Sequence, residues 1–140
     1  MSDCIFCKII NGEIPASKVY EDEHVLAFLD ISQITKGHTL VIPKAHYENL
    51  FDLPQESAEK LFSVVPKIVN AMKSQLHIED LNLVSNSGRK AGQEVFHLHL
   101  HLIPRYGKGD GYGAVWKSNA NNYTREDLQN LAETIASGIV

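Results

Sequence analysis

Three of the seven histidines in this chain lie in one short run of the sequence. The run QEVFHLHLHLIPR spans residues 93–105 and contains His97, His99 and His101, each followed by a leucine. In a β-strand, successive side chains point to opposite faces, so the three imidazoles would share one face and the leucines the other. We therefore expect a strand that buries its leucines against helices and presents a row of imidazoles on its other face.

A row of imidazoles suits two kinds of chemistry. Histidine has an unperturbed pKa near neutrality, and its two ring nitrogens can serve different partners. One imidazole can act as a nucleophile while a neighbour orients it or handles a proton. Adjacent imidazoles can also bind a metal ion. A third interpretation is that the histidines lie on a surface strand and have no functional role, and it fits their strict alternation least well.

The cysteines of the chain are Cys4 and Cys7, in C-x-x-C spacing. This spacing occurs in redox pairs and in halves of metal sites. A redox motif would follow the first strand of a βαβ unit, and no strand is predicted before these cysteines, so half of a metal site is favoured. A structural zinc site needs four nitrogen or sulfur ligands. His97 and His46, which follows a predicted strand at 38–43, can complete it.

The sequence thus predicts a structural Zn²⁺ site that attaches the N-terminal segment to the sheet. Its ligands would be Cys4, Cys7, His46 and His97. Three other histidines, His24, His38 and His77, remain competing ligands at this point. If the four predicted residues bind the zinc, His99 and His101 remain available for catalysis.

The chain has 140 residues and a net charge of −4, without a run of basic residues. We expect one domain over residues 1–140 and no nucleic acid polymer as a partner, because polymer binding needs clustered lysine and arginine. A single nucleotide is compatible, since a few amides and polar side chains can hold one phosphate. The N-terminal segment lacks the pattern of a secretory signal, and no apolar run suffices to cross a bilayer. We expect a cytoplasmic protein that has no membrane partner.

Hydrophobic periodicity predicts the elements that would position these residues. Apolar runs predict strands at 17–21, 24–30, 38–43, 80–86 and 95–104. Helical spacing predicts one long helix over 55–76, with Pro66 as a kink, and a short turn at 5–11. A C-terminal helix begins at a capping box of Thr124 and Asp127. The apolar stripes of both longer helices are expected to join the core.

The order of these elements points to the fold class. Helices do not alternate with every strand, so a doubly wound parallel sheet is unsuitable. The sequence predicts an α+β fold, with a mainly antiparallel sheet of five strands and helices packed on one face.

Several segments together resemble the histidine triad (HIT) family, and in particular its zinc-containing bacterial nucleotide-binding branch. HLHLHLIP matches the His-x-His-x-His pattern of the family, and NSGRKAGQEVFH is similar to the segment that precedes it. Upstream, IFCKIINGEIPASKVYEDEHVLAFLDISQITKGHTLVIPKAH resembles the N-terminal half of that branch almost throughout. The resemblance covers residues 4–106, and the C-terminal extension 107–140 is less diagnostic. It implies a HIT-like fold and a homodimer.

The resemblance also implies a role for each matching position. His99 would attack the α-phosphorus of a nucleotide and become nucleotidylated, and His101 would bond to the α-phosphate oxygens. The zinc ligands of the family fall on the four residues named above. The positions near the ribose fall on Asp30 and Ser32. Those near the phosphate fall on Asn86, Gln93, Glu94 and Val95, and those near the base on Ile5, Phe6, Ile9 and Phe28.

The function implied is a hydrolase or transferase acting at the α-phosphate of purine nucleoside monophosphate esters or amides, with AMP or GMP as the nucleotide. The intermediate would be a covalent nucleotidyl-histidine. One alternative is a dinucleoside polyphosphate hydrolase. Another is a nucleotide-binding or interaction module with structural zinc and little activity.

One position departs from the family pattern. The nucleotide-binding branch often has a serine directly after the glutamine, where this chain has Glu94. A carboxylate beside an α-phosphate would repel it, unless it points outward or takes a proton from the leaving group. We expect His38 to be a hydrogen-bonding residue of the core. Trp116 and the glycine-rich segment 106–113 could shape the substrate mouth or a dimer surface, or form an ordinary mobile loop.

Overall fold

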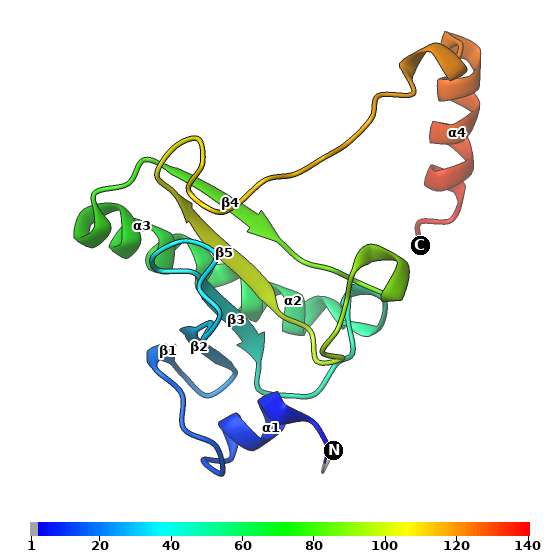
Figure 1. Cartoon of the computed structure of the whole chain (residues 1–140). Coiled ribbons are helices and arrows are strands. Elements are labelled where there is room, and N and C mark those ends of the chain that lie inside the picture. The colour runs from blue at the N-terminus through cyan, green and yellow to red at the C-terminus, as the bar shows by residue number, and fades with distance from the viewer. Residues whose placement is uncertain (1–2) are drawn as a thin grey trace.

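The computed structural model describes residues 3–140 (Figure 1). It contains a five-stranded antiparallel sheet in the order β1-β2-β3-β5-β4, which confirms the predicted α+β class. The strands are β1 Lys18–Glu21, β2 Val25–Leu29, β3 Thr39–Pro43, β4 Asp80–Val84 and β5 Leu100–Arg105. The helices are α1 Ile5–Ile10, α2 Gln55–Ser63, α3 Val65–Leu76 and α4 Arg125–Ser137. One-turn 3₁₀ helices lie at Leu50–Asp52, Arg89–Ala91 and Ala120–Asn122.

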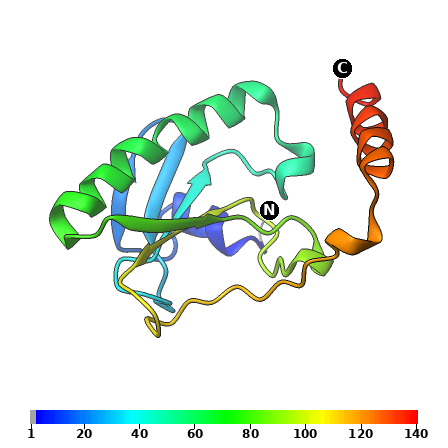
Figure 2. The same ribbon diagram turned by 90° about the horizontal axis from the view of Figure 1, so that it is seen from above.

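Both faces of the sheet are covered, whereas we expected helices on one face. α2 and α3 lie on one side and α1 on the other (Figure 2). The reason is that β2 and β3 are apolar at nearly every position, so both of their faces must be buried. Alternate residues pack toward α2 and α3: Val25, Ala27 and Val41. The residues between them pack toward α1: Leu26, Phe28, Leu40 and Ile42.

The long helix predicted over 55–76 is two helices, α2 and α3. They are separated at Val64, and Pro66 lies in the first turn of α3. Proline has no amide hydrogen and is tolerated at this position, where the amide would have no helical partner. In place of the predicted kink, the helix is interrupted at the single residue Val64, whose backbone stays in the right-handed helical region. α3 ends at His77, which adopts a left-handed conformation with φ of 58°.

The histidine run becomes a regular strand later than predicted. We expected a strand over 95–104, but β5 begins at Leu100. The chain before it is bonded to a loop, because the Leu98 amide donates to the Tyr47 carbonyl at 2.7 Å. The predicted alternation holds nevertheless. The leucines packed in the core with α2 and α3 are Leu98, Leu100 and Leu102.

Asp110 organises the turn that follows β5. Its carboxylate accepts two hydrogen bonds from the Arg105 guanidinium, at 2.9 and 3.2 Å, and one from the Tyr106 amide at 2.8 Å. The Tyr106 hydroxyl donates to the Lys36 carbonyl at 2.6 Å, which attaches the turn to the loop before β3. The glycine-rich segment 106–113 thus contains a hydrogen-bonded turn, and none of its residues lines the cavity described below.

The C-terminal helix α4 stands apart from the sheet at the end of an extended segment (Figure 1). The predicted capping box is confirmed, since Thr124 and Asp127 exchange hydrogen bonds of 2.8 and 3.1 Å. The prediction that its apolar stripe joins the core is wrong. The extended segment leads α4 away from the body, so the stripe has no surface of its own chain to pack against. Its exposed members are Leu128, Leu131, Ala132 and Ile135.

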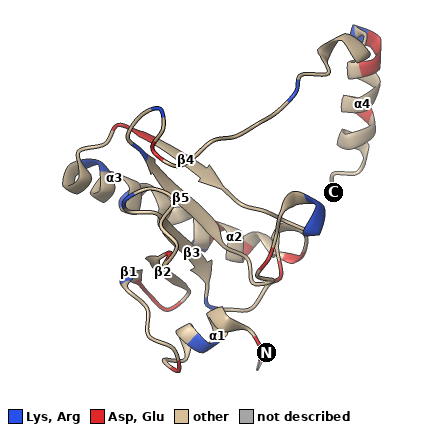
Figure 3. Ribbon diagram, in the orientation of Figure 1, with Lys and Arg blue, Asp and Glu red and all other residues tan. Residues whose placement is uncertain are grey.

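Charged residues of both signs are interspersed over the molecule (Figure 3). No helix within residues 3–140 is long and apolar enough to span a membrane.

We expect Asp110→Asn to lower the melting temperature at neutral pH. The Arg105 guanidinium and the backbone amides hold the pKa of the Asp110 carboxyl far below its usual range. Such a group stabilises the fold above its pKa in the unfolded chain, and the stabilisation is lost as the pH falls toward the folded value. The difference from the parent protein should be largest above about pH 5 and shrink below about pH 4. Thermal denaturation followed by circular dichroism measures it.

Glu79→Gln provides the control for this prediction, because it removes an exposed carboxylate that takes no part in the turn. It should leave the melting temperature nearly unchanged over the same range. A difference for Asp110→Asn that stays constant or grows as the pH falls would contradict the assignment.

Candidate active site and metal centre

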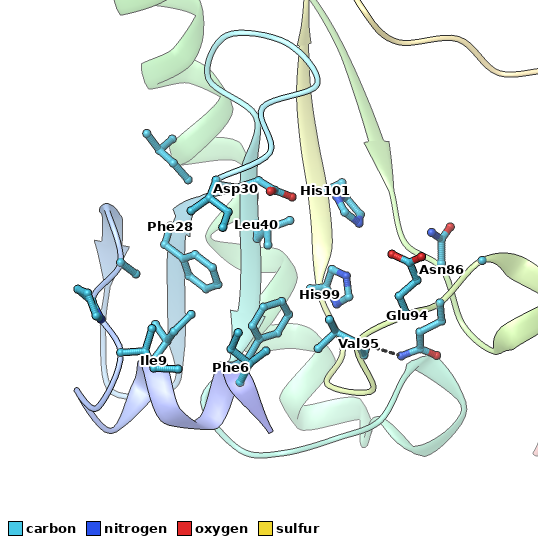
Figure 4. Close-up of a pocket in the computed structure, with 18 residues that line it drawn as sticks. Phe6, Ile9, Phe28, Asp30, Leu40, Asn86, Glu94, Val95, His99 and His101 are labelled. Carbon is cyan, nitrogen blue, oxygen red and sulfur yellow. Dashed lines mark hydrogen bonds between the residues drawn. The ribbon is translucent and has the colours of Figure 1, made fainter. Parts of the chain in front are cut away.

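A cavity of about 420 Å³ lies on the α1 side of the sheet. Its walls come from α1, from the ends of β2 and β3, from the loop before the histidine run, and from the run itself (Figure 4). Most of the predicted nucleotide contacts line it. These are Ile5, Phe6, Ile9, Phe28, Asp30, Asn86, Gln93, Glu94, Val95, His99 and His101. Pockets of this size commonly bind small molecules.

Ser32 differs from the other predicted contacts, because it lies outside the lining. It is exposed, and its amide donates to Asp30 Oδ1 at 2.7 Å. Sequence reasoning missed further lining residues, namely Ile14, Pro15, Ala16, Leu29, Ile31, Leu40 and Gly92. The apolar strand ends and the Pro15 turn were visible in the sequence, but only the folded chain brings them to the same cavity.

One end of the cavity is aromatic. The Phe6 and Phe28 rings meet edge to face with their centroids 5.5 Å apart. Phe6 also meets the His99 imidazole edge to face, at 5.1 Å. The Phe6 side chain of α1 therefore contacts both the aromatic end of the cavity and the His99 imidazole.

His99 presents an unprotonated ring nitrogen to the cavity. Its Nδ1 lies 2.7 Å from the His97 carbonyl oxygen. Because a carbonyl only accepts hydrogen bonds, Nδ1 must carry the proton, which leaves the lone pair on Nε2. Burial lowers the pKa of His99, so the neutral imidazole is favoured at neutral pH. A neutral imidazole with a free Nε2 is a competent nucleophile.

His101 has the opposite tautomer, through a chain of hydrogen bonds from the backbone. The Ile34 amide donates to His38 Nδ1 at 3.3 Å, so the proton of His38 resides on Nε2. That nitrogen lies 2.9 Å from His101 Nδ1 and donates to it, which leaves His101 with a proton on Nε2. Burial and the neighbouring His99 lower the pKa of His101 to about 4. His101 thus offers a hydrogen-bond donor to the cavity.

His38 is a buried hydrogen-bonding residue, as the sequence suggested, and it belongs to the wall behind the site. Its side chain is 1% exposed, and Nε2 also lies 3.7 Å from the Asp30 carboxylate. The possible metal ligands of Asp30, His38 and His101 lie within 4.8 Å of one another. The hydrogen bond between the two imidazoles accounts for this proximity without an ion.

The loop before the histidine run is held by the buried amide of Gln93. Its Nε2 donates to the Glu48 carbonyl at 2.6 Å, and its Oε1 accepts from the Gly88 amide at 2.8 Å and from Asn49 at 3.1 Å. Gln93 Nε2 also donates to the Val95 carbonyl at 3.1 Å, so these bonds hold the backbone on both sides of Glu94. The Glu94 side chain lines the cavity.

A second cluster lies between the N-terminal end of α1 and the sheet. The ligand atoms of Cys4, Cys7, His46 and His97 all lie within 4.8 Å of one another. The nearest sulfur to nitrogen distances are 3.3, 3.4 and 3.6 Å. Bonds of about 2.3 Å to sulfur and about 2.0–2.1 Å to nitrogen at tetrahedral angles place these atoms about 3.5 Å apart. The four residues predicted from the sequence can therefore form a metal site.

The protonation states of His97 and Cys7 indicate that this cluster can bind a cation. His97 Nε2 donates to the Pro43 carbonyl at 2.8 Å, which leaves the Nδ1 lone pair facing the sulfurs. Burial lowers the pKa of His97 to about 4. Burial and the adjacent Cys4 sulfur raise the pKa of the Cys7 thiol to about 11. Two thiolates at this position thus need a positive ion, and a metal ion would supply that charge.

Relatives of this chain share its length as well as its motifs. One relative, Protein hit from Bacillus subtilis, is 62% identical over 134 residues, which cover 96% of this chain and 92% of the relative. The adenosine 5′-monophosphoramidase of Schizosaccharomyces pombe is 40% identical over 136 residues, covering 97% and 98% of the two chains.

Solved structures agree in fold. A HIT family protein from Bacillus anthracis has a TM-score of 0.96 and 65% identity, with coverage of 99% of this chain and 98% of that one. A Zn-bound histidine triad family protein from Mycobacterium smegmatis has a TM-score of 0.75 and 37% identity, with coverage of 95% and 98%. The model of the HIT domain matches residues 11–108. Together with the cavity and its imidazoles, these similarities show that the chain belongs to the histidine triad family.

Proposed function

We propose that this protein hydrolyses purine nucleoside monophosphate esters or amides at the α-phosphate, through a covalent intermediate on His99. The observation that carries the proposal is the 2.7 Å hydrogen bond from His99 Nδ1 to the His97 carbonyl, which leaves Nε2 free in the cavity. The name of the S. pombe relative, an adenosine 5′-monophosphoramidase, supports the class of reaction.

The reaction would proceed by two displacements. In the first, the Nε2 lone pair of His99 forms a bond to phosphorus, and the bond from phosphorus to the leaving oxygen or nitrogen breaks. The leaving group keeps that electron pair and takes up a proton. In the second, water bonds to phosphorus and releases a proton, and the electron pair of the N–P bond returns to Nε2. One difficult substitution is thereby divided into two easier ones.

The residues around His99 would bind and stabilise the phosphate. His101, with its proton on Nε2, would donate to the α-phosphate oxygens as negative charge develops. The Asp30 carboxylate at the other wall would accept from the ribose hydroxyls, with Ser32 beside it. The aromatic pair Phe6 and Phe28 would contact the base. This arrangement suits an AMP- or GMP-type nucleotide.

We also propose that the Cys4, Cys7, His46 and His97 cluster holds structural Zn²⁺. When bound, zinc would link the N-terminal end of α1 to the chain after β3 and to the histidine run. All four positions would be filled by the protein, so the ion would have no open site for substrate. The Zn-bound family member from M. smegmatis supports this assignment.

We expect His99→Ala to lower the turnover of adenosine 5′-phosphoramidate by at least about 10³-fold, because the nucleophile is removed. AMP binding should change by less than about fivefold, since the other contacts remain. Steady-state kinetics and titration calorimetry measure the two effects. His24→Ala, an exposed histidine outside the cavity, should leave both unchanged. Turnover by His99→Ala at the parental rate would eliminate the nucleophile assignment.

Elemental analysis should find about one zinc per chain in protein purified without chelators. Cys7→Ser should lose most of that zinc and melt at a lower temperature, because α1 is then held to the sheet only by its apolar packing. His24→Ala again serves as the matched control and should retain the metal. A protein with a Cys4–Cys7 disulfide and no metal would rule the zinc assignment out.

The resemblance further leads us to propose a homodimer. The exposed stripe of α4 supports this, because an apolar helix face without a partner in its own chain needs another surface. Sedimentation equilibrium should give a mass near twice that of the 15.6 kDa chain. Leu131→Asp, in the middle of the stripe, should shift the distribution toward the monomer if α4 takes part. A monomeric parent protein would refute the dimer.

A further inference from the structure

Among the residues that the structure describes, no lysine and no arginine lines the cavity. Within residues 3–140, the formally charged residues of its lining are Asp30 and Glu94, both acidic. The basic residues lie elsewhere on the molecule (Figure 3). Protein sites for polyphosphates offset the negative charge with lysine, arginine or a metal ion. A cavity whose charged groups are two carboxylates does not supply that compensation.

The two carboxylates are not equivalent. Asp30 accepts a hydrogen bond from the Ser32 amide at 2.7 Å and lies 3.7 Å from His38 Nε2. Glu94 is exposed, and none of the ion pairs within residues 3–140 includes it. Its charge is therefore not neutralised by the protein and can act on a bound ligand.

The position of Glu94 is set by its neighbours in the chain. The buried Gln93 side chain is bonded to the Glu48 carbonyl and the Gly88 amide, so the backbone that carries Glu94 is fixed. The Glu94 carboxylate is directed to the side of the cavity where His99 and Asn86 lie (Figure 4). A leaving group departs from the face of the phosphorus opposite His99 Nε2, so one that departs toward Asn86 would pass this carboxylate.

Glu94 also borders a second hollow, which opens beyond the cavity. Its lining includes two more acidic residues, Asp3 and Glu48, beside the proposed metal ligands Cys4 and His46. Arg89 contacts its lining from outside, with the guanidinium 5.1 Å from the centre of the Phe96 ring. Within residues 3–140, the formally charged residues that line the cavity and this hollow are thus all acidic.

We infer that Glu94 selects nucleotides whose leaving group carries a positive charge and disfavours anionic leaving groups such as phosphate chains. This inference rests on the proposed function, because it concerns the group displaced by His99. It assigns a physical role to the residue that occupies the position of the family serine. A cationic substituent would be attracted by the carboxylate beside the phosphorus, and an anionic one would be repelled.

The test uses three phosphoramidates of AMP with the same P–N bond and nearly the same chain length. The amines are propane-1,3-diamine, whose free end is an ammonium, butylamine, which ends in a methyl group, and β-alanine, which ends in a carboxylate. For the zinc-loaded parent protein, we expect kcat/KM to fall in that order, by about three- to tenfold at each step. Raising the salt concentration to about 0.5 M should compress the ratios.

Glu94→Gln keeps the size of the side chain and removes its charge. It should bring the three kcat/KM values within about twofold of one another. Glu79→Gln, an exposed carboxylate outside the cavity, should keep the parental ratios. Equal values in the parent protein, or parental ratios in Glu94→Gln, would overturn the inference.

Binding of the same three compounds to His99→Ala, measured by calorimetry, separates this inference from the proposed reaction. Dissociation constants that rise from the diamine to the β-alanine derivative, and converge when Glu94→Gln is added, support the role of Glu94. Equal dissociation constants contradict it. If the parent protein turns over none of the three compounds, the proposed reaction fails, and the binding series still decides the role of Glu94.

Discussion

The buried imidazole of His97 makes contacts in two directions, and its backbone carbonyl makes a third. Nε2 donates to the Pro43 carbonyl at the end of β3, and Nδ1 faces the sulfurs of Cys4 and Cys7. The carbonyl accepts the Nδ1 proton of His99. One residue thus joins the sheet, the N-terminal helix and the His99 imidazole. Any shift of His97 would disturb the candidate metal site and the proposed nucleophile together, because both depend on one position of the backbone.

The fold was predictable where the residue pattern reflects local geometry. Five strands, their antiparallel class and the capping box at Thr124 follow from periodicity and end signals. The break at Val64 was not predictable as more than a kink, because proline in a first helical turn and proline inside a helix look alike in sequence. The exposure of α4 was also missed. An apolar stripe predicts that a helix face is buried against another surface, but it does not show whether that surface belongs to the same chain.

The candidate site was predictable in its residue types and less so in its protonation. The C-x-x-C spacing and the alternating histidines suggested which side chains would meet, and the resemblance assigned them roles. The tautomer of His99 depends on the nearby His97 carbonyl, whereas that of His101 depends on a backbone group far away in the sequence. The Ile34 amide directs the proton of His38, and through it the proton of His101, by contacts that no local pattern encodes. The charge of the cavity likewise emerges only when Asp30 and Glu94 are brought to the same space.

Helix α1 has six residues, too few to be stable alone in water, because one or two turns do not offset the cost of nucleation. It depends on Cys4, which accepts a hydrogen bond from the Cys7 amide, and on Phe6 and Ile9, which pack against the sheet. The cysteines belong to the candidate metal site and Phe6 to the cavity wall. Ordering of α1 therefore couples the two sites. By thermodynamic linkage, the factor by which an ion at the sulfurs raises the affinity for a ligand in the cavity is also the factor by which that ligand raises the affinity for the ion.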